Sequence, residues 1–185
     1  MTAEQRYVQQ IQAYTSWKQL RGLWEEIAAG KQQKDWPAGK AFEYLILRAF
    51  ELSGAGVRYP FRVQLFDQDE IEQIDGVIHF DNVSAIIESK NYAQERLNVE
   101  PIAKLRNHLM RRPSNAIGCV FCTTGFTTPA IMLAHFTSPQ TILLWEKDEI
   151  TFVLENENLR EAFFVKYQHC IETGEPHLKV FTKMK

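Results

Sequence analysis

The sequence lacks the features that mark secreted or membrane-bound proteins. It has only three cysteines in 185 residues, an odd number that suits a reducing compartment and not a disulfide framework. Its first residues, MTAEQRYVQQIQ, are too polar for a signal peptide, and no apolar run approaches the roughly 20 residues that cross a bilayer. We therefore expect a cytoplasmic protein with no membrane partner.

The chain also has almost no net charge. Its 21 basic and 23 acidic residues leave −2 at pH 7, so a surface for a polyanion must be a local patch. With 45% hydrophobic and 24% charged residues, the composition is typical of a folded domain with a sizeable core.

Hydrophobic periodicity predicts an α/β protein. Helical spacing of apolar residues predicts helices over residues 3–29 (interrupted near Thr15 and Ser16), 39–53, 99–112, about 128–136 and 161–172. Runs rich in β-branched residues predict strands over 57–66, 74–80, 83–90, 116–123 and 141–145, with an acidic loop at 67–72. This order favours an α/β sandwich with a central mixed sheet flanked by helices.

The same pattern divides the chain into three parts. Residues 1–38 form an N-terminal helical extension, 39–150 the core, and 151–185 a C-terminal helix and tail that pack on the core. Three tryptophans, Trp17, Trp24 and Trp36, give the extension more aromatic surface than two short helices can bury. They are expected to pack either on the core or on a second subunit.

The most informative segment is a hairpin over residues 74–90. Asp81 and Asn82, which lie between the two strands, are residues typical of a two-residue hairpin turn. If Phe80 pairs with Val83, Asp75 falls opposite Glu88, and Gln73 falls opposite Lys90. Because side chains alternate along a strand, one face then carries Asp75, Glu88 and Lys90, and the other carries Ile74, Ile78, Phe80, Val83, Ala85 and Ile87.

Two facing acids destabilise a strand pair unless a cation lies between them or one pKa is raised. We therefore predict a divalent metal at Asp75 and Glu88. The alternative is a surface salt bridge with Lys90, which stabilises little. Cys119 and Cys122 are not a second metal site, since residues three apart on a strand point to opposite faces.

Several motifs in residues 39–150 resemble the PD-(D/E)xK nuclease superfamily, and within it the Mrr-like restriction endonucleases. The matching positions are Gly39 and Glu43, Asp75-Gly76-Val77, Glu88, Lys90 and Tyr92, and the strand-to-helix segment 120–127. The segment before Asp75 departs from the Mrr-like pattern, because it is acidic where a glycine-rich stretch is typical. The runs Gln-Ile-Asp-Gly-Val and Glu-Ser-Lys-Asn are also similar to the NERD domains of the same superfamily, so the subfamily stays open.

The resemblance implies a restriction-endonuclease-like fold and a catalytic role for four residues. Asp75 and Glu88 would ligate Mg²⁺ or Mn²⁺ together with the backbone carbonyl of Ser89. Glu43 would hold a second ion or act through water, and Lys90 would orient the attacking water. Hard oxygen ligands suit Mg²⁺, although an acid in a first helical turn, such as Glu43, also stabilises the helix.

The expected partner is DNA, and a homodimer is one expectation for an enzyme that cuts both strands. Basic and aromatic side chains that follow Lys90 are candidates for phosphate contacts: Asn91, Tyr92, Arg96, Lys104, Arg106, Arg111 and Arg112. We expect a metal-dependent deoxyribonuclease of the restriction or defence type. The alternatives are a repair or junction-resolving nuclease, and a DNA-binding or assembly module of the same fold without turnover.

Overall fold

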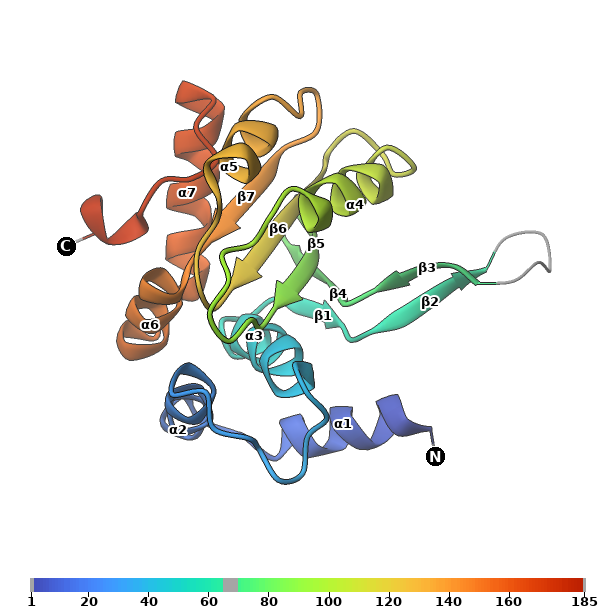
Figure 1. The fold of residues 1–185 in the computed structure, drawn as a ribbon, viewed down its shortest axis with the longest axis vertical. Helices are drawn as coiled ribbons and strands as arrows, with labels where there is room; N and C mark the ends of the chain where they lie inside the picture. The colour runs from blue at the N-terminus through green and yellow to red at the C-terminus, as the bar shows by residue number, and fades with distance from the viewer. Residues whose placement is uncertain (1, 65–69, 185) are drawn as a thin grey trace.

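A five-stranded mixed sheet forms the centre of the computed structural model, which describes residues 2–64 and 70–184 (Figure 1). The strand order is β1 (Gly56–Arg58), β4 (Gly76–Phe80), β5 (Val83–Lys90), β6 (Ala116–Cys122) and β7 (Ile142–Trp145). β1, β4 and β5 are antiparallel, whereas β5, β6 and β7 are parallel. The predicted mixed sheet, with its antiparallel strands first in the chain, is confirmed.

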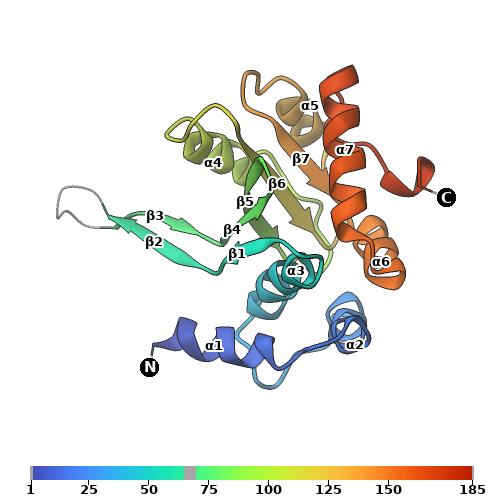
Figure 2. The ribbon, with the colours of Figure 1, turned by 180° about the vertical axis from the view of Figure 1, so that it is seen from behind.

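Helices cover both faces of this sheet (Figures 1 and 2). One face packs in the larger core cluster with α3 (Lys40–Leu52), α6 (Lys147–Asn156) and α7 (Leu159–Thr173). The other face packs in a second cluster with α4 (Glu100–Leu109) and α5 (Thr128–His135). Cys119 belongs to the first cluster and Cys122 to the second, so the two thiols point to opposite faces as predicted. No helix of the described residues is long and apolar enough to cross a membrane.

The N-terminal extension consists of α1 (Ala3–Gln12) and α2 (Trp17–Ala28), which lie against α3. The predicted interruption is confirmed, because Ser16 caps α2 and forms a capping box with Gln19. Trp24 and Trp36 are buried in the larger core cluster. Packing on the core is therefore confirmed for Trp24 and Trp36, and Trp17 is partly buried against the same cluster.

The hairpin has the predicted register. Phe80 pairs with Val83 across Asp81-Asn82, and the ladder continues to Gly76 opposite Ile87. Asp81 has a φ of 42°, a turn conformation that Asp tolerates.

The strand before Asp75 is where the prediction was wrong. β3 (Glu70–Ile74) leaves the central sheet and pairs with β2 (Phe61–Gln64), so Gln73 lies opposite Arg62 and not opposite Lys90. Ile74 consequently packs in the second core cluster, not with Ile78. The two strands form a ribbon that projects from the body (Figures 1 and 2).

Two further element boundaries differ from the prediction near this ribbon. The predicted strand 57–66 is divided at Tyr59-Pro60, because proline cannot donate to a strand ladder. The predicted acidic loop is partly strand: Glu70 to Glu72 belong to β3, and Glu72 is 4% exposed. Residues 67–69 of that loop lie outside the described residues.

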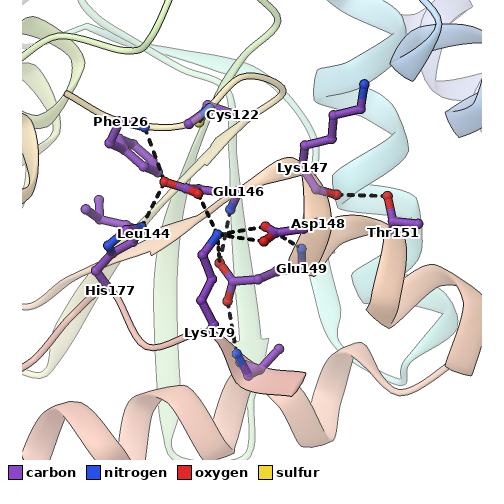
Figure 3. Close-up of polar contacts among 12 residues, drawn as sticks. Cys122, Phe126, Leu144, Glu146, Lys147, Asp148, Glu149, Thr151, His177 and Lys179 are labelled. Carbon is purple, nitrogen blue, oxygen red and sulfur yellow. Dashed lines mark hydrogen bonds and ion pairs between the residues drawn. The ribbon is translucent and has the colours of Figure 1, made fainter. Parts of the chain in front are cut away.

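Helix α6 was not predicted, and it connects the sheet to the C-terminal segment. Glu146 precedes α6, and its carboxylate accepts hydrogen bonds from Phe126 N and His177 Nε2. It also forms an ion pair with Lys179 Nζ at 2.5 Å (Figure 3). Although burial opposes it, the contacts from His177 and Lys179 lower the pKa of Glu146 to about 2. Glu146 thus fixes the tail to the end of β7.

Glu146→Gln is expected to lower the free energy of unfolding at pH 7 by about 2 kcal/mol, because a charged acceptor is lost. The folded-state pKa of Glu146 lies below its ordinary value of 4.5. The stabilisation of the fold by this carboxylate is therefore complete above pH 4.5 and disappears as the pH falls towards about 2. Urea unfolding should therefore show a smaller decline in stability between pH 5 and pH 2 for the variant than for the wild type. Glu155→Gln, on the exposed side of α6, is the control; equal declines in all three proteins would contradict the assignment.

Candidate active site

Asp75 lies at the point where the chain passes from the β2–β3 ribbon into the central sheet. It follows β3 and directly precedes β4. Its Oδ2 accepts a hydrogen bond from the backbone N–H of Ser89 at 3.1 Å. The carboxylate therefore takes the place of a ladder partner for β5 and is fixed beside Glu88.

Glu88 and Lys90 complete a compact charged cluster at the end of β5. Lys90 Nζ lies 2.6 Å from Glu88 Oε1 and 3.8 Å from Asp75 Oδ2. Glu88 is 1% and Asp75 5% exposed. The two acids and the lysine therefore face one small volume, as the predicted register implies.

Lys104 on α4 also belongs to this cluster. Its Nζ lies 3.2 Å from Glu88 Oε1 and 3.3 Å from Oε2. Its side chain is 43% exposed, so the predicted DNA contact of Lys104 stays a prediction, and in the fold its amine also compensates the charge of a buried acid. The sequence places Lys104 sixteen residues after Glu88, with no local spacing that relates them.

Glu43 approaches the cluster from the first turn of α3. It forms an ion pair with Lys40 Nζ at 2.6 Å, a contact at i,i+3 spacing that the sequence itself could have indicated. Burial and the negative charge of Asp75 raise the pKa of Glu43. Glu43 is therefore close enough to Asp75 to feel its charge.

The pKa values of the cluster reflect buried acids that lie close together. Burial and the charge of Glu88 raise the pKa of Asp75. Burial of Lys90 opposes its charge, but the carboxylates of Glu88 and Asp75 outweigh it and raise the pKa of the amine. Bringing a further cation to these acids would relieve their repulsion.

The donor set fits a hard divalent cation in its chemistry. Asp75 and Glu88 offer buried carboxylate oxygens, and Mg²⁺ prefers such ligands and retains several waters. Among the described residues, no three His, Cys, Asp or Glu side chains form a ready metal-binding group. Ser89 O lies 3.4 Å from Lys90 Nζ, so this carbonyl also faces the lysine.

The remaining candidate DNA contacts fall into two groups. Asn91, Tyr92, Arg96 and Arg106 are exposed. Arg111 and Arg112, by contrast, both form ion pairs with the buried Glu72 of β3. These two arginines join the segment after α4 to the ribbon, which leaves less of their charge for a phosphate.

Thr123 is a residue at the site that the prediction gave no role. Its Oγ1 donates to Asn91 Oδ1 at 3.0 Å and accepts from Tyr92 N at 3.2 Å. The backbone of Thr123 also donates to Lys90 O at 3.3 Å. Thr123 lies in the segment 120–127 that matches the family motifs, but the motif by itself predicts no contact for this residue.

Gly76 permits the close approach of the hairpin to α3. A Cβ at this position would meet both methyl groups of Leu47, one of them at 2.7 Å. Leu47 is fully buried one turn after Glu43. The glycine after Asp75 thus allows the start of β4 to pack against α3, the helix that carries Glu43.

Gly76→Ala is expected to lower the free energy of unfolding by about 1–3 kcal/mol, because the added methyl overpacks a filled site. Combining it with Leu47→Ala should recover part of that loss, which a double-mutant cycle in urea would detect as a coupling energy. Gly22→Ala is the control, since nothing lies within 4 Å of its added Cβ and it replaces a glycine inside a helix. Strict additivity of the two core substitutions would contradict the contact.

Comparison with known proteins gives one family and a fold. The family model Mrr_cat, described as a restriction endonuclease, matches residues 37–154, more than half of the chain. No curated protein matches.

Among solved structures, the chain is similar to the DNA modification-dependent restriction endonuclease AspBHI, with 17% identity, a TM-score of 0.50, and coverage of 76% of this chain and 36% of AspBHI. The protein of unknown function AF1548 shares 16% identity at a TM-score of 0.48, with coverage of 71% of this chain and 76% of that one. The restriction endonuclease MspJI, solved with a 27-mer oligonucleotide, shares 17% identity at a TM-score of 0.42, with coverage of 76% and 30%. The chain thus spans about a third of AspBHI and of MspJI, and the likeness to AspBHI is one of fold.

Proposed function

Since the chain belongs to the Mrr-type restriction endonuclease family, we propose that it hydrolyses DNA phosphodiester bonds in a reaction that depends on Mg²⁺ or Mn²⁺. The observation that carries this proposal is the contact of Lys90 Nζ with the carboxylates of both Glu88 and Asp75. Two buried acids and an amine at the end of one strand are the groups that this hydrolysis needs. A restriction or defence role is the most direct one for the family.

Asp75 and Glu88 would hold the cation, with the Ser89 carbonyl as a further oxygen. When bound, a divalent ion supplies positive charge at the scissile phosphate and makes water a stronger acid. The negative charge of both acids favours binding, and their burial limits competition from water.

Lys90 would stabilise the negative charge that develops on the phosphate. Its raised pKa favours the protonated amine at neutral pH, which donates hydrogen bonds and does not accept a proton. Glu43, the third acid of the cluster and held by Lys40 at 2.6 Å, would receive the proton of the attacking water. We therefore assign the stabilisation of charge on the phosphate to Lys90, and the role of proton acceptor to Glu43.

The exposed residues near the site would contact the DNA backbone. Asn91 and Tyr92 directly follow Lys90, and Arg96 and Arg106 have no ion pair within the described part of the chain. One active site per chain would favour a homodimer if both strands are cut.

Lys90→Ala and Glu88→Gln should each lower nicking of supercoiled plasmid by at least about 100-fold, because Lys90 would stabilise the charge that develops on the phosphate and Glu88 would hold the cation. Nicking is measured by gel in Mg²⁺, Mn²⁺ or EDTA, with thermal melting to establish that the variants are folded. Lys34→Ala, an exposed lysine of the α2–α3 connector, is the control and should cut like the wild type.

Nicking that persists in EDTA, or that survives both substitutions, would remove the proposed mechanism. A gel shift without cleavage in any metal would favour the DNA-binding module. A preference for branched over plasmid DNA would assign the same site to a repair or junction-resolving nuclease.

A further inference from the structure

A cavity of about 170 Å³ opens directly beyond the end of β5. Its lining includes Asn91 and Tyr92 after β5, Thr123 and Thr124 after β6, Lys31 after α2, and Lys147 at the start of α6. In open α/β sheets, ligands bind at the carboxyl ends of parallel strands. The volume is below the roughly 300 Å³ of small-molecule sites, so the cavity suits a phosphate group or part of one nucleotide and not an organic cofactor.

The charge of this cavity is positive and uncompensated. No carboxylate is among its described lining residues. Lys147 Nζ donates to Ala28 O at 2.7 Å, a neutral acceptor that leaves its charge unpaired. Lys31 is exposed and forms no ion pair within residues 2–64 and 70–184.

The acids closest in sequence to Lys147 do not cancel this charge. Glu146 and Asp148 both form ion pairs with Lys179, and Figure 3 shows Lys147 pointing away from that group. The Glu146 cluster therefore supports the start of α6 and leaves Lys147 available to an anion.

The cavity is held in a fixed position relative to the candidate active site. Asn91 follows Lys90, and consecutive Cα atoms are about 3.8 Å apart. Thr123 Oγ1 donates to the side chain of Asn91 and accepts from the backbone of Tyr92. The lining of the cavity therefore begins one residue after Lys90.

We propose that the cavity binds a nucleotide that flanks the bond to be cut, with Lys31 and Lys147 contacting its phosphate. Tyr92, 41% exposed at the rim, offers a ring for the base. Lys31 lies outside residues 37–154 that match the family. The N-terminal extension thus adds a DNA contact to the family core, and this inference rests on the proposed function.

The test measures how DNA affinity depends on salt. A fluorescent duplex with 5′-hydroxyl ends is titrated with the full chain in EDTA, and anisotropy gives the affinity from 50 to 200 mM salt. Lys31→Gln and Lys147→Gln should each reduce the slope of log K against log salt by about 0.9, so that each variant loses about 3-fold less affinity over this range than the wild type. Lys18→Gln, which removes one exposed charge near the start of α2, should retain the wild-type slope.

Two further measurements distinguish a phosphate contact from other causes of a reduced slope. Lys147→Arg keeps the charge and should restore the slope; if it behaves like Lys147→Gln, the effect is structural and the inference is wrong. The second uses a duplex that carries 5′-phosphates. If Lys31→Gln and Lys147→Gln reduce the slope only with this duplex, the cavity binds strand ends and not a flanking nucleotide, which also overturns the inference.

The outcomes also distinguish this inference from the proposed function. If the wild type cuts DNA but both glutamine variants keep the slope of Lys18→Gln, only the cavity assignment fails. If the wild type neither binds nor cuts DNA, the proposed function fails and the cavity assignment fails with it.

Discussion

The hydrogen bond from the backbone of Ser89 to the Asp75 carboxylate is the contact on which the arrangement depends. The ladder between β4 and β5 ends at Gly76 and Ile87, and beyond it the main chain before Asp75 turns away into the β2–β3 ribbon. The side chain of Asp75 replaces the missing backbone partner. It thereby holds one acid beside Glu88 while the ribbon leaves in another direction. Gly76 supports the same geometry, because its lack of a side chain leaves room for the side chain of Leu47 on α3.

Burying acids at this position requires compensating charge. Glu88 is 1% exposed and has Lys90 and Lys104 as partners, and Glu43 has Lys40. A buried acid without such partners would be strongly destabilising. Burial first, and the charge of a neighbouring acid second, raise the pKa values of Asp75 and Glu43, and a divalent ion would offset the second of these effects.

The sequence predicted those parts of the molecule that follow from local patterns. The register of the hairpin follows from the turn at Asp81-Asn82, and the opposite placement of Cys119 and Cys122 follows from strand periodicity. The sequence could not predict the departure of Gln73 from the sheet, because the choice between pairing with Lys90 and pairing with Arg62 depends on long-range packing. Likewise, the ion pairs of Lys104, Arg111 and Arg112 depend on which buried acids they reach, which periodicity does not predict, and the predicted helix over 99–112 ends at Leu109, before the two arginines.

The most direct measurement of the central claim is Mn²⁺ binding by isothermal titration calorimetry, with a nuclease-resistant duplex bound. The wild type and Glu25→Gln, a substitution of an exposed acid on α2, should bind Mn²⁺ alike, whereas Asp75→Asn and Glu88→Gln should abolish Mn²⁺ binding. Equal Mn²⁺ binding by all four proteins, or none by the wild type, would contradict the claim that Asp75 and Glu88 together form a metal site.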